Sequence, residues 1–203
     1  MKIVIDEGSG TIFDDDRPWL GGNIRGGDAR CEDPAVWNYL ISRFQPLSII
    51  DVGCGEGQLM KYFYDHNIIV CGVDGLEVNR ENADSSIADK IIVHDYRDGA
   101  LIIPADMVLA CEFVEHIDVR YMVNFLPQFC ACKTLIFTHA VPDQAGHHHV
   151  NCQTDEYWVT LMTTLGLVFK EEETTYARSL VKDSFWRTLL IFEQPIIYYN
   201  LKI

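Results

Sequence analysis

Two glutamates and a histidine stand close together in CEFVEHID, residues 111–118, where an apolar run ends. If a helical turn follows, Glu112, Glu115 and His116 occupy positions i, i+3 and i+4 and share one face. Carboxylate and imidazole groups placed in this way could bind a metal ion or exchange a proton with a substrate. Glu115 could equally be an acid that favours the start of a helix, so the motif needs a structural context.

That context is an alternation of apolar runs, rich in isoleucine and valine, with segments long enough to form helices. It is typical of a parallel sheet covered on both faces. The runs expected as strands are residues 48–52, 68–73, 91–93, 107–111 and 134–137.

The expected helices and the end of the chain complete this outline. Asp33 followed by Pro34 predicts a helix start, and residues 155–164 predict a later helix. Two apolar runs at 167–170 and 187–192, separated by polar residues that we expect to form a loop, predict a pair of antiparallel strands.

Residues 1–32 differ from the rest and contain two short apolar runs, KIVID and TIF, on either side of GSG. We expect a hairpin there, followed by the glycine-rich segment WLGGNIRGGDAR. This segment predicts either a flexible lid over a pocket, with Arg25 available for an anion, or a solvated connector. We find no linker or repeat, so residues 1–203 are expected to form one domain.

A glycine-rich turn, DVGCGEG, follows the first expected strand and precedes a helix start. Glycines there allow a tight turn and let a ligand approach backbone N–H groups. Asp74 ends the next strand, where it could accept hydrogen bonds from ribose hydroxyls. Asp95 follows the strand after that and could accept from an adenine amino group. These strand ends together predict an adenosine site.

DVGCGEG resembles the first motif of the class I S-adenosylmethionine (SAM) dependent methyltransferases, and the resemblance extends from about Asp33 to Glu193. It implies an α/β, Rossmann-like fold: a seven-stranded, mostly parallel sheet with helices on both faces and a C-terminal antiparallel strand. The implied SAM-binding residues are Asp51, Gly53, Gly55, Gly57, Asp74, Asp95 and Tyr96. A nicotinamide-dependent oxidoreductase is the main competitor, but its G-x-G-x-x-G fingerprint places the third glycine one position later.

The E-x-x-E-H stretch after the fourth strand is similar to a motif of the small-RNA 3′-terminal ribose 2′-O-methyltransferases and of quinone-pathway O-methyltransferases. In the RNA enzymes, two glutamates and two histidines bind a divalent metal. The matching residues here are Glu112, Glu115, His116 and His149. The resemblance implies Mg²⁺, Mn²⁺ or Zn²⁺, which would hold and acidify an acceptor hydroxyl. The alternative is metal-free general-base catalysis by His116 or His149. Glu112, His116 and His149 are therefore the candidate catalytic residues.

Composition limits the partners. The net charge of −14 over 203 residues argues against a long nucleic acid bound through its phosphates, although a short RNA end remains an alternative. No apolar run approaches about 18 residues, the N-terminus lacks signal-peptide features, and the seven cysteines fit reduced thiols, so we expect a cytoplasmic protein with no membrane span.

We expect methyl transfer to a small molecule, with oxygen favoured over nitrogen as the acceptor. The alternatives are an RNA-end ribose 2′-O-methyltransferase and a non-catalytic SAM-binding protein. The apolar run IIYYNLKI at 196–203 could cover a sheet edge or join a dimer, and the sequence leaves the oligomeric state open.

Overall fold

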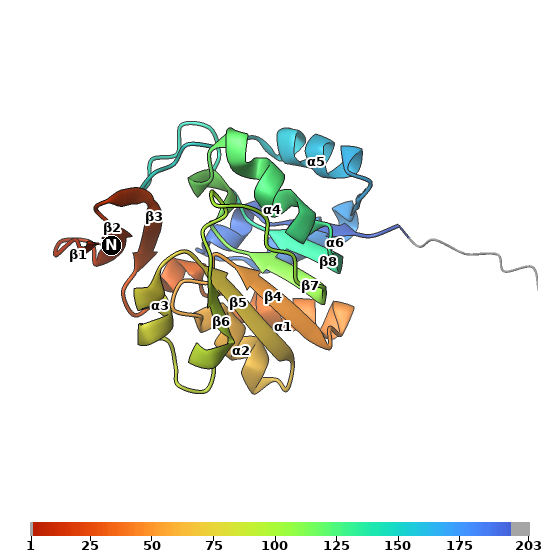
Figure 1. Cartoon of the computed structure of the whole chain (residues 1–203). Coiled ribbons are helices and arrows are strands. Elements are labelled where there is room, and N and C mark those ends of the chain that lie inside the picture. Colours follow the sequence, from red (N-terminus) through yellow and green to blue (C-terminus); the bar gives the residue numbers. More distant parts are fainter. Residues whose placement is uncertain (1, 196–203) are drawn as a thin grey trace, which may run out of the picture.

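A computed structural model of the chain describes residues 2–195. The run IIYYNLKI, for which we considered a sheet edge or a dimer contact, lies outside the described residues. Figure 1 shows a central sheet between two layers of helices, with a smaller sheet at one side.

The central sheet has seven strands in the order β6-β5-β4-β7-β8-β10-β9. The neighbouring pairs among β4 to β8 are parallel, whereas β10 runs antiparallel to both β8 and β9. The predicted fold class is confirmed. The strands are β4 (Ser48–Val52), β5 (Ile69–Asp74), β6 (Ile91–Val93), β7 (Ala105–Ala110), β8 (Cys132–Phe137), β9 (Val168–Phe169) and β10 (Leu190–Glu193).

This strand order places a topological switch point at β4. The chain goes from β4 to β5 and β6 on one side of β4, and then returns to β7 on its other side. Loops diverge at the carboxyl end of a strand in this position and leave a crevice where ligands bind in open α/β sheets. The crevice therefore opens beside Gly53, directly after β4.

The helices cover both faces of the sheet and bury two separate apolar clusters (Figure 1). Phe125 and Trp158 pack on one face, and Trp37, Phe63 and Trp186 pack on the other. The helices are α1 (Pro34–Phe44), α2 (Gln58–Asp65), α3 (Glu77–Asn82), α4 (Met122–Phe129), α5 (Asp155–Thr164) and α6 (Glu171–Leu180). Short 3-10 turns are η1 (Ala29–Cys31), η2 (Ala88–Lys90), η3 (Val114–His116), η4 (Val119–Tyr121) and η5 (Phe185–Thr188).

Helix α1 begins as the sequence predicts. The Asp33 carboxylate accepts from the backbone N–H of Val36 at 3.2 Å, which satisfies one of the free donors in the first turn. Its other oxygen accepts from the Ser184 hydroxyl at 2.8 Å. The cap therefore also ties the start of α1 to the segment before β10.

Helix α6 corrects the expectation of a polar loop between the last two strands. Three glutamates, Glu171–Glu173, occupy its first turn, where negative charge is favourable, and Arg178 lies in its last turn. Only Thr174 and Ala177 are buried, so the helix lacks the apolar stripe by which a sequence reveals a helix. The predicted antiparallel pairing of β9 with β10 is confirmed.

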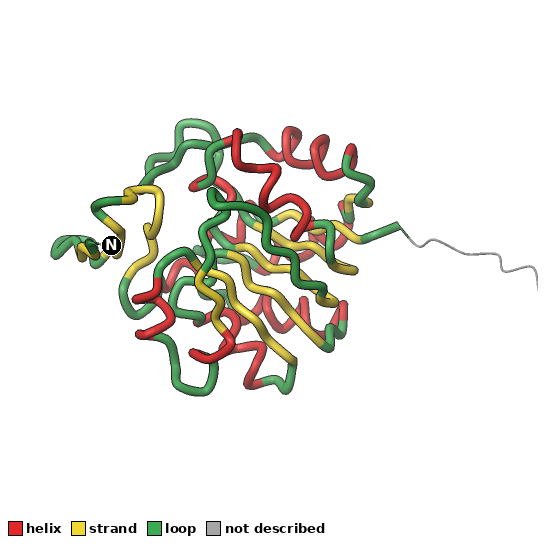
Figure 2. The backbone as a smooth tube through the Cα atoms, in the orientation of Figure 1, coloured by secondary structure: helices red, strands yellow, loops and turns green. Residues whose placement is uncertain are grey.

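Residues 2–24 form a three-stranded antiparallel sheet of β1 (Ile3–Ile5), β2 (Thr11–Asp14) and β3 (Arg17–Ile24). The glycine-rich segment, expected as a flexible lid or a connector, therefore contributes a strand. Gly21 has a positive φ of 102°, and a Cβ there would lie 2.2 Å from the Ile12 carbonyl oxygen, so glycine is required for the strands to approach. Figure 2 shows this small sheet standing beside the main one.

Candidate functional site

The glycine turn after β4 is held to the neighbouring strand by its backbone. Gly53 donates its N–H to the Val73 carbonyl at 2.8 Å, and Gly55 donates to the Asp74 carboxylate at 2.9 Å. Gly53 has a φ of 74°, and a Cβ on it would lie 2.7 Å from the Phe113 ring. A residue with a side chain would therefore collide with the segment after β7, so the turn requires glycine at this position.

Two acids beside the turn, the buried Asp51 and the partly buried Asp74, face the cavity. Asp51 is 2 % exposed, and one of its carboxylate oxygens has no hydrogen-bond partner. Burial, and then the charge of Asp74, raise the pKa of Asp51 to about 7. Burial also raises the pKa of Asp74, although its carboxylate accepts from Gly55, Leu76 and Asn79. The oxygen of Asp51 is available to a donor from a bound molecule.

Asp95 follows β6 and is also buried. One of its oxygens accepts from the backbone N–H of Arg97 at 2.8 Å, and the other accepts from the Trp19 indole at 2.9 Å. Tyr96 packs against Phe113 in the core, and its hydroxyl is buried without a partner. Burial raises the pKa of Tyr96, so its hydroxyl keeps the proton.

All the predicted SAM-binding residues except Gly57 line one cavity of about 560 Å³. The cavity extends to Glu112, His116 and His149, so it joins the glycine turn to the histidine-containing loop. Gly57 instead packs under the turn, where an added Cβ would lie 2.7 Å from Ile87.

Backbone contacts bring His149 to the segment after β7. The backbone N–H groups of Val150 and Asn151 both donate to the Glu115 carbonyl, at 2.9 and 3.1 Å. The Asn151 side chain donates to the Val114 carbonyl at 3.3 Å. These bonds fasten the loop after β8 to η3, so residues distant in sequence become neighbours.

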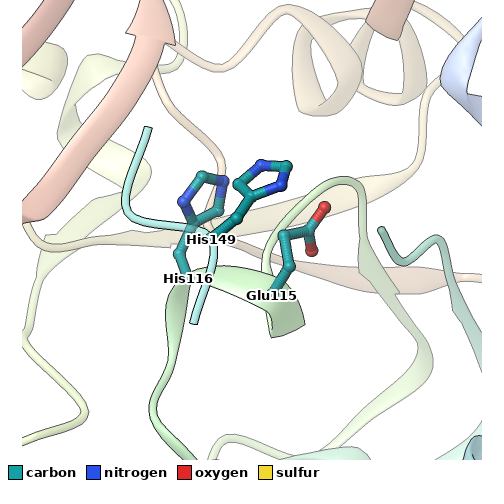
Figure 3. A group of neighbouring side chains, drawn as sticks. All are labelled: Glu115, His116 and His149. Atoms are coloured by element: carbon teal, nitrogen blue, oxygen red, sulfur yellow. The ribbon is translucent and has the colours of Figure 1, made fainter. Parts of the chain in front are cut away.

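The structure brings together Glu115, His116 and His149, one ligand atom of each lying within 4.8 Å of the others (Figure 3). The two imidazole rings meet edge to face, with centroids 5.0 Å apart. The His149 Nδ1 lies 3.0 Å from the Gln144 carbonyl oxygen, a contact that fixes the ring and leaves Nε2 for another partner. We call these three residues the Glu115 cluster.

The Glu115 cluster has polar atoms without partners. Glu115 is fully buried, and neither carboxylate oxygen has a hydrogen-bond partner. Burial, and then the charge of Glu112, raise the pKa of Glu115 well above its usual value. Burial, and then the charge of His149, lower the pKa of His116 to about 3, and its Nδ1 is buried without a partner. A carboxyl group beside two imidazoles can bind a metal ion or hold a proton.

Glu112 lies outside this cluster, although the sequence places all four residues in one ligand set. Its φ is +50°, which ends β7 in a turn instead of starting a helix. Its carboxylate accepts from the Thr138 hydroxyl at 2.8 Å, and burial raises its pKa. Glu112 therefore borders the Glu115 cluster: its carboxyl group has Thr138 as a partner and also lies within hydrogen-bonding reach of the Glu115 carboxyl group.

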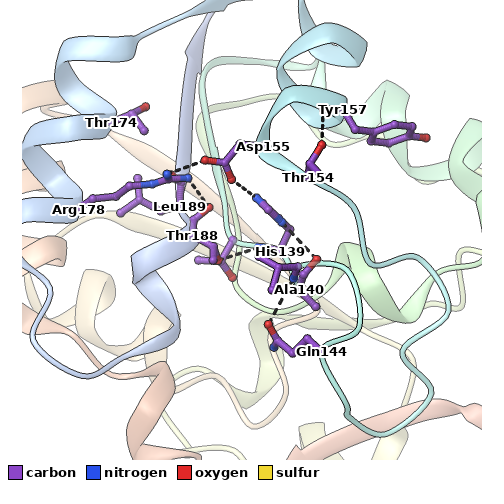
Figure 4. Close-up of polar contacts among 12 residues, drawn as sticks. His139, Ala140, Gln144, Thr154, Asp155, Tyr157, Thr174, Arg178, Thr188 and Leu189 are labelled. Atoms are coloured by element: carbon purple, nitrogen blue, oxygen red, sulfur yellow. Dashed lines mark hydrogen bonds and ion pairs between the residues drawn. The ribbon is translucent and has the colours of Figure 1, made fainter.

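His139 belongs to a different group, which we call the His139 cluster (Figure 4). His139 is 1 % exposed, and its Nε2 lies 2.8 Å from the Asp155 carboxylate. Asp155 also accepts from Arg178 at 2.7 Å, and Arg178 donates to the carbonyls of Thr188 and Leu189. This chain of contacts ties β8, α5 and α6 together.

The cavity also includes groups for which the sequence predicts no contact with the cofactor. Trp19 and Asn23 come from β3, while Arg30, Phe185 and Arg187 form the wall beyond Cys111. Arg25, expected to meet an anion, does not line the cavity in the described chain. No local pattern marks these residues, because segments distant in sequence carry them.

The part of the cavity lining beyond Cys111, formed by Arg30, Phe185 and Arg187, is basic and aromatic. The guanidinium of Arg30 lies 4.8 Å from the centre of the Phe185 ring, and that of Arg187 lies 6.0 Å away. The Trp186 indole donates to the Cys31 carbonyl at 2.7 Å and joins the two segments that carry the arginines. The hydrogen bond with Cys31, together with burial, raises the pKa of the Cys111 thiol and disfavours a nucleophilic thiolate.

Solved structures resemble this chain in fold. Magnesium protoporphyrin IX methyltransferase from Synechocystis PCC 6803, with bound SAM, is 15% identical with a TM-score of 0.59, over 79% of this chain and 77% of that one. The Burkholderia thailandensis 1,6-didemethyltoxoflavin-N1-methyltransferase is 13% identical with a TM-score of 0.58, over 82% and 81%. The cyclase SpnF is also 13% identical with a TM-score of 0.57, over 80% and 81%.

At these identities the likeness shows the class I methyltransferase fold, and the cyclase indicates that the fold alone does not fix the reaction. No protein-family model matches the sequence, and no curated protein matches it. Within residues 2–195, no helix combines the length and apolar character needed to cross a membrane.

Proposed function

We propose that this protein is a SAM-dependent methyltransferase. The glycine turn, the partly unsatisfied Asp51, and the acids at the end of β5 and after β6 share one cavity at the switch point of the sheet. These groups suit the amino group, the ribose and the adenine of SAM, in that order along the sheet edge. SAM carries an activated methyl group, so the protein must align the acceptor and remove its proton.

We further propose that the Glu115 cluster binds a divalent cation, Mg²⁺, Mn²⁺ or Zn²⁺, next to the acceptor. The observation that carries this proposal is the Glu115 carboxylate, which is fully buried with both oxygens unpartnered and lies beside two imidazoles. A buried acid without a partner is costly unless a proton or a cation occupies its site. Mixed carboxylate and imidazole ligands suit these metals, and a bound cation would supply a Lewis acid for the acceptor hydroxyl.

Metal-free catalysis is the rival proposal. In it, His116 or His149 takes the acceptor proton; the pKa of His116, lowered to about 3, keeps that ring neutral but makes it a weak base, so this mechanism rests mainly on His149. This mechanism requires a proton on Glu115, which its raised pKa and its contact with Glu112 support, whereas a cation would occupy the Glu115 oxygens together with the two imidazoles. In either case His116 and His149 are the proposed catalytic residues, with Glu112 beside them.

The acceptor that fits best is a small molecule with a hydroxyl group and an acidic group. The Arg30, Phe185 and Arg187 wall offers a ring face and guanidinium groups to such a molecule, in a protein whose net charge is −14. An RNA end presents the same hydroxyl and phosphate chemistry and is the second candidate, supported by the E-x-x-E-H spacing. The free cysteines favour a reducing compartment, so we place the activity in the cytoplasm.

Two experiments test the proposal. Calorimetry of SAM and S-adenosylhomocysteine (SAH) binding should give one site per chain, and no binding would reject a methyltransferase. Transfer of a tritiated methyl group from SAM, screened over small hydroxy acids, their uncharged analogues and short RNAs, then identifies the acceptor. SAM binding without transfer to any of these acceptors would favour a non-catalytic SAM-binding protein.

A further inference from the structure

The three-stranded sheet reaches over the adenosine end of the cavity through Trp19. Its indole donates to the Asp95 carboxylate, the predicted partner of the adenine amino group, at 2.9 Å. The Arg97 guanidinium lies 4.2 Å from the centre of the Trp19 ring, and the Arg97 backbone N–H holds the other Asp95 oxygen. Trp19 and Arg97 thereby fix both oxygens of one buried carboxylate.

A second contact from β3 reaches the ribose end. Asn23 and Asn79 exchange two side-chain hydrogen bonds, at 3.0 and 3.1 Å, and Asn79 is fully buried. Asn79 also donates to the Asp74 carboxylate at 2.9 Å. A chain of amides therefore links β3 to the acid expected to bind the ribose.

Further contacts place β3 and the residues after it across the cavity. The backbone N–H of Gly26 donates to the Glu56 carboxylate at 2.8 Å, beside the glycine turn. At the opposite end, the Pro18 carbonyl lies 2.9 Å from the His147 ring nitrogen. A Cβ on Gly22 would lie 3.2 Å from the His116 ring, so the strand passes directly over the Glu115 cluster.

We propose that Trp19 and Asn23 are positioning residues for the adenosine part of the cofactor, an inference that rests on the proposed SAM-dependent function. Trp19 orients Asp95 toward the 6-amino group of adenine. Asn23, acting through Asn79, orients Asp74 toward the ribose hydroxyls. The small sheet is thus a wall of the cofactor site that the class I core by itself lacks.

The physical argument concerns buried carboxylates. A carboxylate accepts several hydrogen bonds, and each donor from the protein restricts the directions of its remaining lone pairs. Removing the indole N–H leaves one Asp95 oxygen unpartnered and free to turn away from the ligand. A hydrogen bond to a charged group contributes enough that losing this alignment should weaken binding about tenfold.

The test measures binding of two ligands to the full chain by calorimetry: SAH and S-inosylhomocysteine, in which the adenine amino group is replaced by an oxo group. Trp19→Phe should weaken SAH binding about tenfold and change S-inosylhomocysteine binding less than about threefold. Asn23→Ala leaves the indole in place and should weaken both ligands alike, because both carry the ribose. Glu7→Gln, in the exposed turn after β1, is the matched control and should change neither.

The proposal is decided by comparing how much each variant weakens the binding of SAH and of S-inosylhomocysteine. Equal weakening of both ligands by Trp19→Phe would show a merely structural role for the indole and overturn its assignment to adenine. If Trp19→Phe does not fold, unchanged affinities in Asn23→Ala would overturn the proposal for the wall. Wild-type protein that fails to bind SAH would instead overturn the proposed function, and this inference with it.

Discussion

The Glu115 cluster and the His139 cluster contain similar groups in opposite states. In the His139 cluster, the imidazole faces the Asp155 carboxylate, which also accepts from Arg178. In the Glu115 cluster, the carboxylate is buried with neither oxygen partnered. A buried network in which every polar group has a hydrogen-bond partner stabilises the fold. A buried polar group without a partner lowers stability, and it is retained where a bound ligand supplies the partner. The chemistry of a histidine and an acid is therefore decided by their partners.

The largest expected contrast is between Glu115→Gln and Asp155→Asn. Glu115→Gln should lower methyl transfer by a factor on the order of 10² or more and leave the thermal stability of cation-free protein nearly unchanged, because the raised pKa already keeps Glu115 protonated and glutamine is a neutral group of similar size. Asp155→Asn should keep most of the activity and lower the unfolding free energy by about 1–2 kcal/mol, since it weakens contacts with His139 and Arg178. Transfer assays and thermal melts check both, and loss of stability in Glu115→Gln would contradict the contrast.

The histidines provide the next contrast. His149→Ala should weaken binding of Mn²⁺ or Zn²⁺ about 10- to 100-fold without unfolding the protein, because His149 is only partly buried. His139→Ala should leave cation binding nearly unchanged and lower the unfolding free energy by about 2–3 kcal/mol, since Asp155 loses a partner and a cavity forms. Metal titration and urea unfolding separate the two effects. Equal cation affinities in both variants would contradict the assignment of His149.

The cofactor end of the cavity and the His139 cluster should also respond to pH in opposite directions. The pKa of Asp51 in the cavity is raised by burial from 3.8 to about 7, so folded protein keeps a proton that the unfolded chain releases. The stability that this proton provides is present below about pH 3.8 and is lost as the pH rises toward 7. Asp51→Asn has no carboxyl group to titrate, so the stability of this variant should fall less than that of the wild type as the pH rises. Thermal midpoints measured between pH 4 and 8 check this.

Asp155 gives the opposite sign. Burial raises its pKa, but the hydrogen bond and charge of Arg178 outweigh burial, so the net pKa lies below the usual value. Its contribution to stability is present at neutral pH and is lost as the pH falls through that lowered value. Asp155→Asn should therefore cost most stability near neutral pH and little in acid. Matching pH profiles for the Asp51 and Asp155 variants would contradict the distinction.

The smallest expected effect concerns the acceptor wall. Arg187→Ala should raise the KM for an acidic acceptor several-fold, because the exposed guanidinium lines the cavity beside Phe185 and can pair with an acidic group. It should leave SAH affinity unchanged. Lys182→Ala is a matched surface control on the same segment. An unchanged KM for acidic acceptors would remove Arg187 from the acceptor site.

Much of the cofactor end could be predicted because parallel strands bring their carboxyl ends to one edge. Asp51, Asp74 and Asp95 each lie in or directly after a strand, so the strand pattern already implies their proximity. The proximity of His116 and His149 does not follow from the strand pattern. Only the resemblance implies it, because it depends on hydrogen bonds from a loop to the Glu115 carbonyl, which no periodicity predicts.

The differences from the sequence predictions have physical causes. The predicted helical face with Glu115 does not begin at Glu112, because its φ is positive; its carboxylate accepts from Thr138 and contacts Glu115, so its place in the ligand set stays a prediction. The sequence predicts a loop where helix α6 forms, because the buried side of that helix is so small. The role of Trp19 could not be anticipated, since β3 owes its position to contacts with residues far along the chain.

The most direct test of the central claim is calorimetric titration of Mn²⁺ or Zn²⁺ into chelator-treated, untagged protein, with Glu115→Gln measured in parallel. The account predicts one cation per wild-type chain, a higher thermal midpoint on binding, and loss of that site in the variant. A wild-type protein that binds no cation more tightly than Glu115→Gln would contradict it and leave His116 and His149 as metal-free bases.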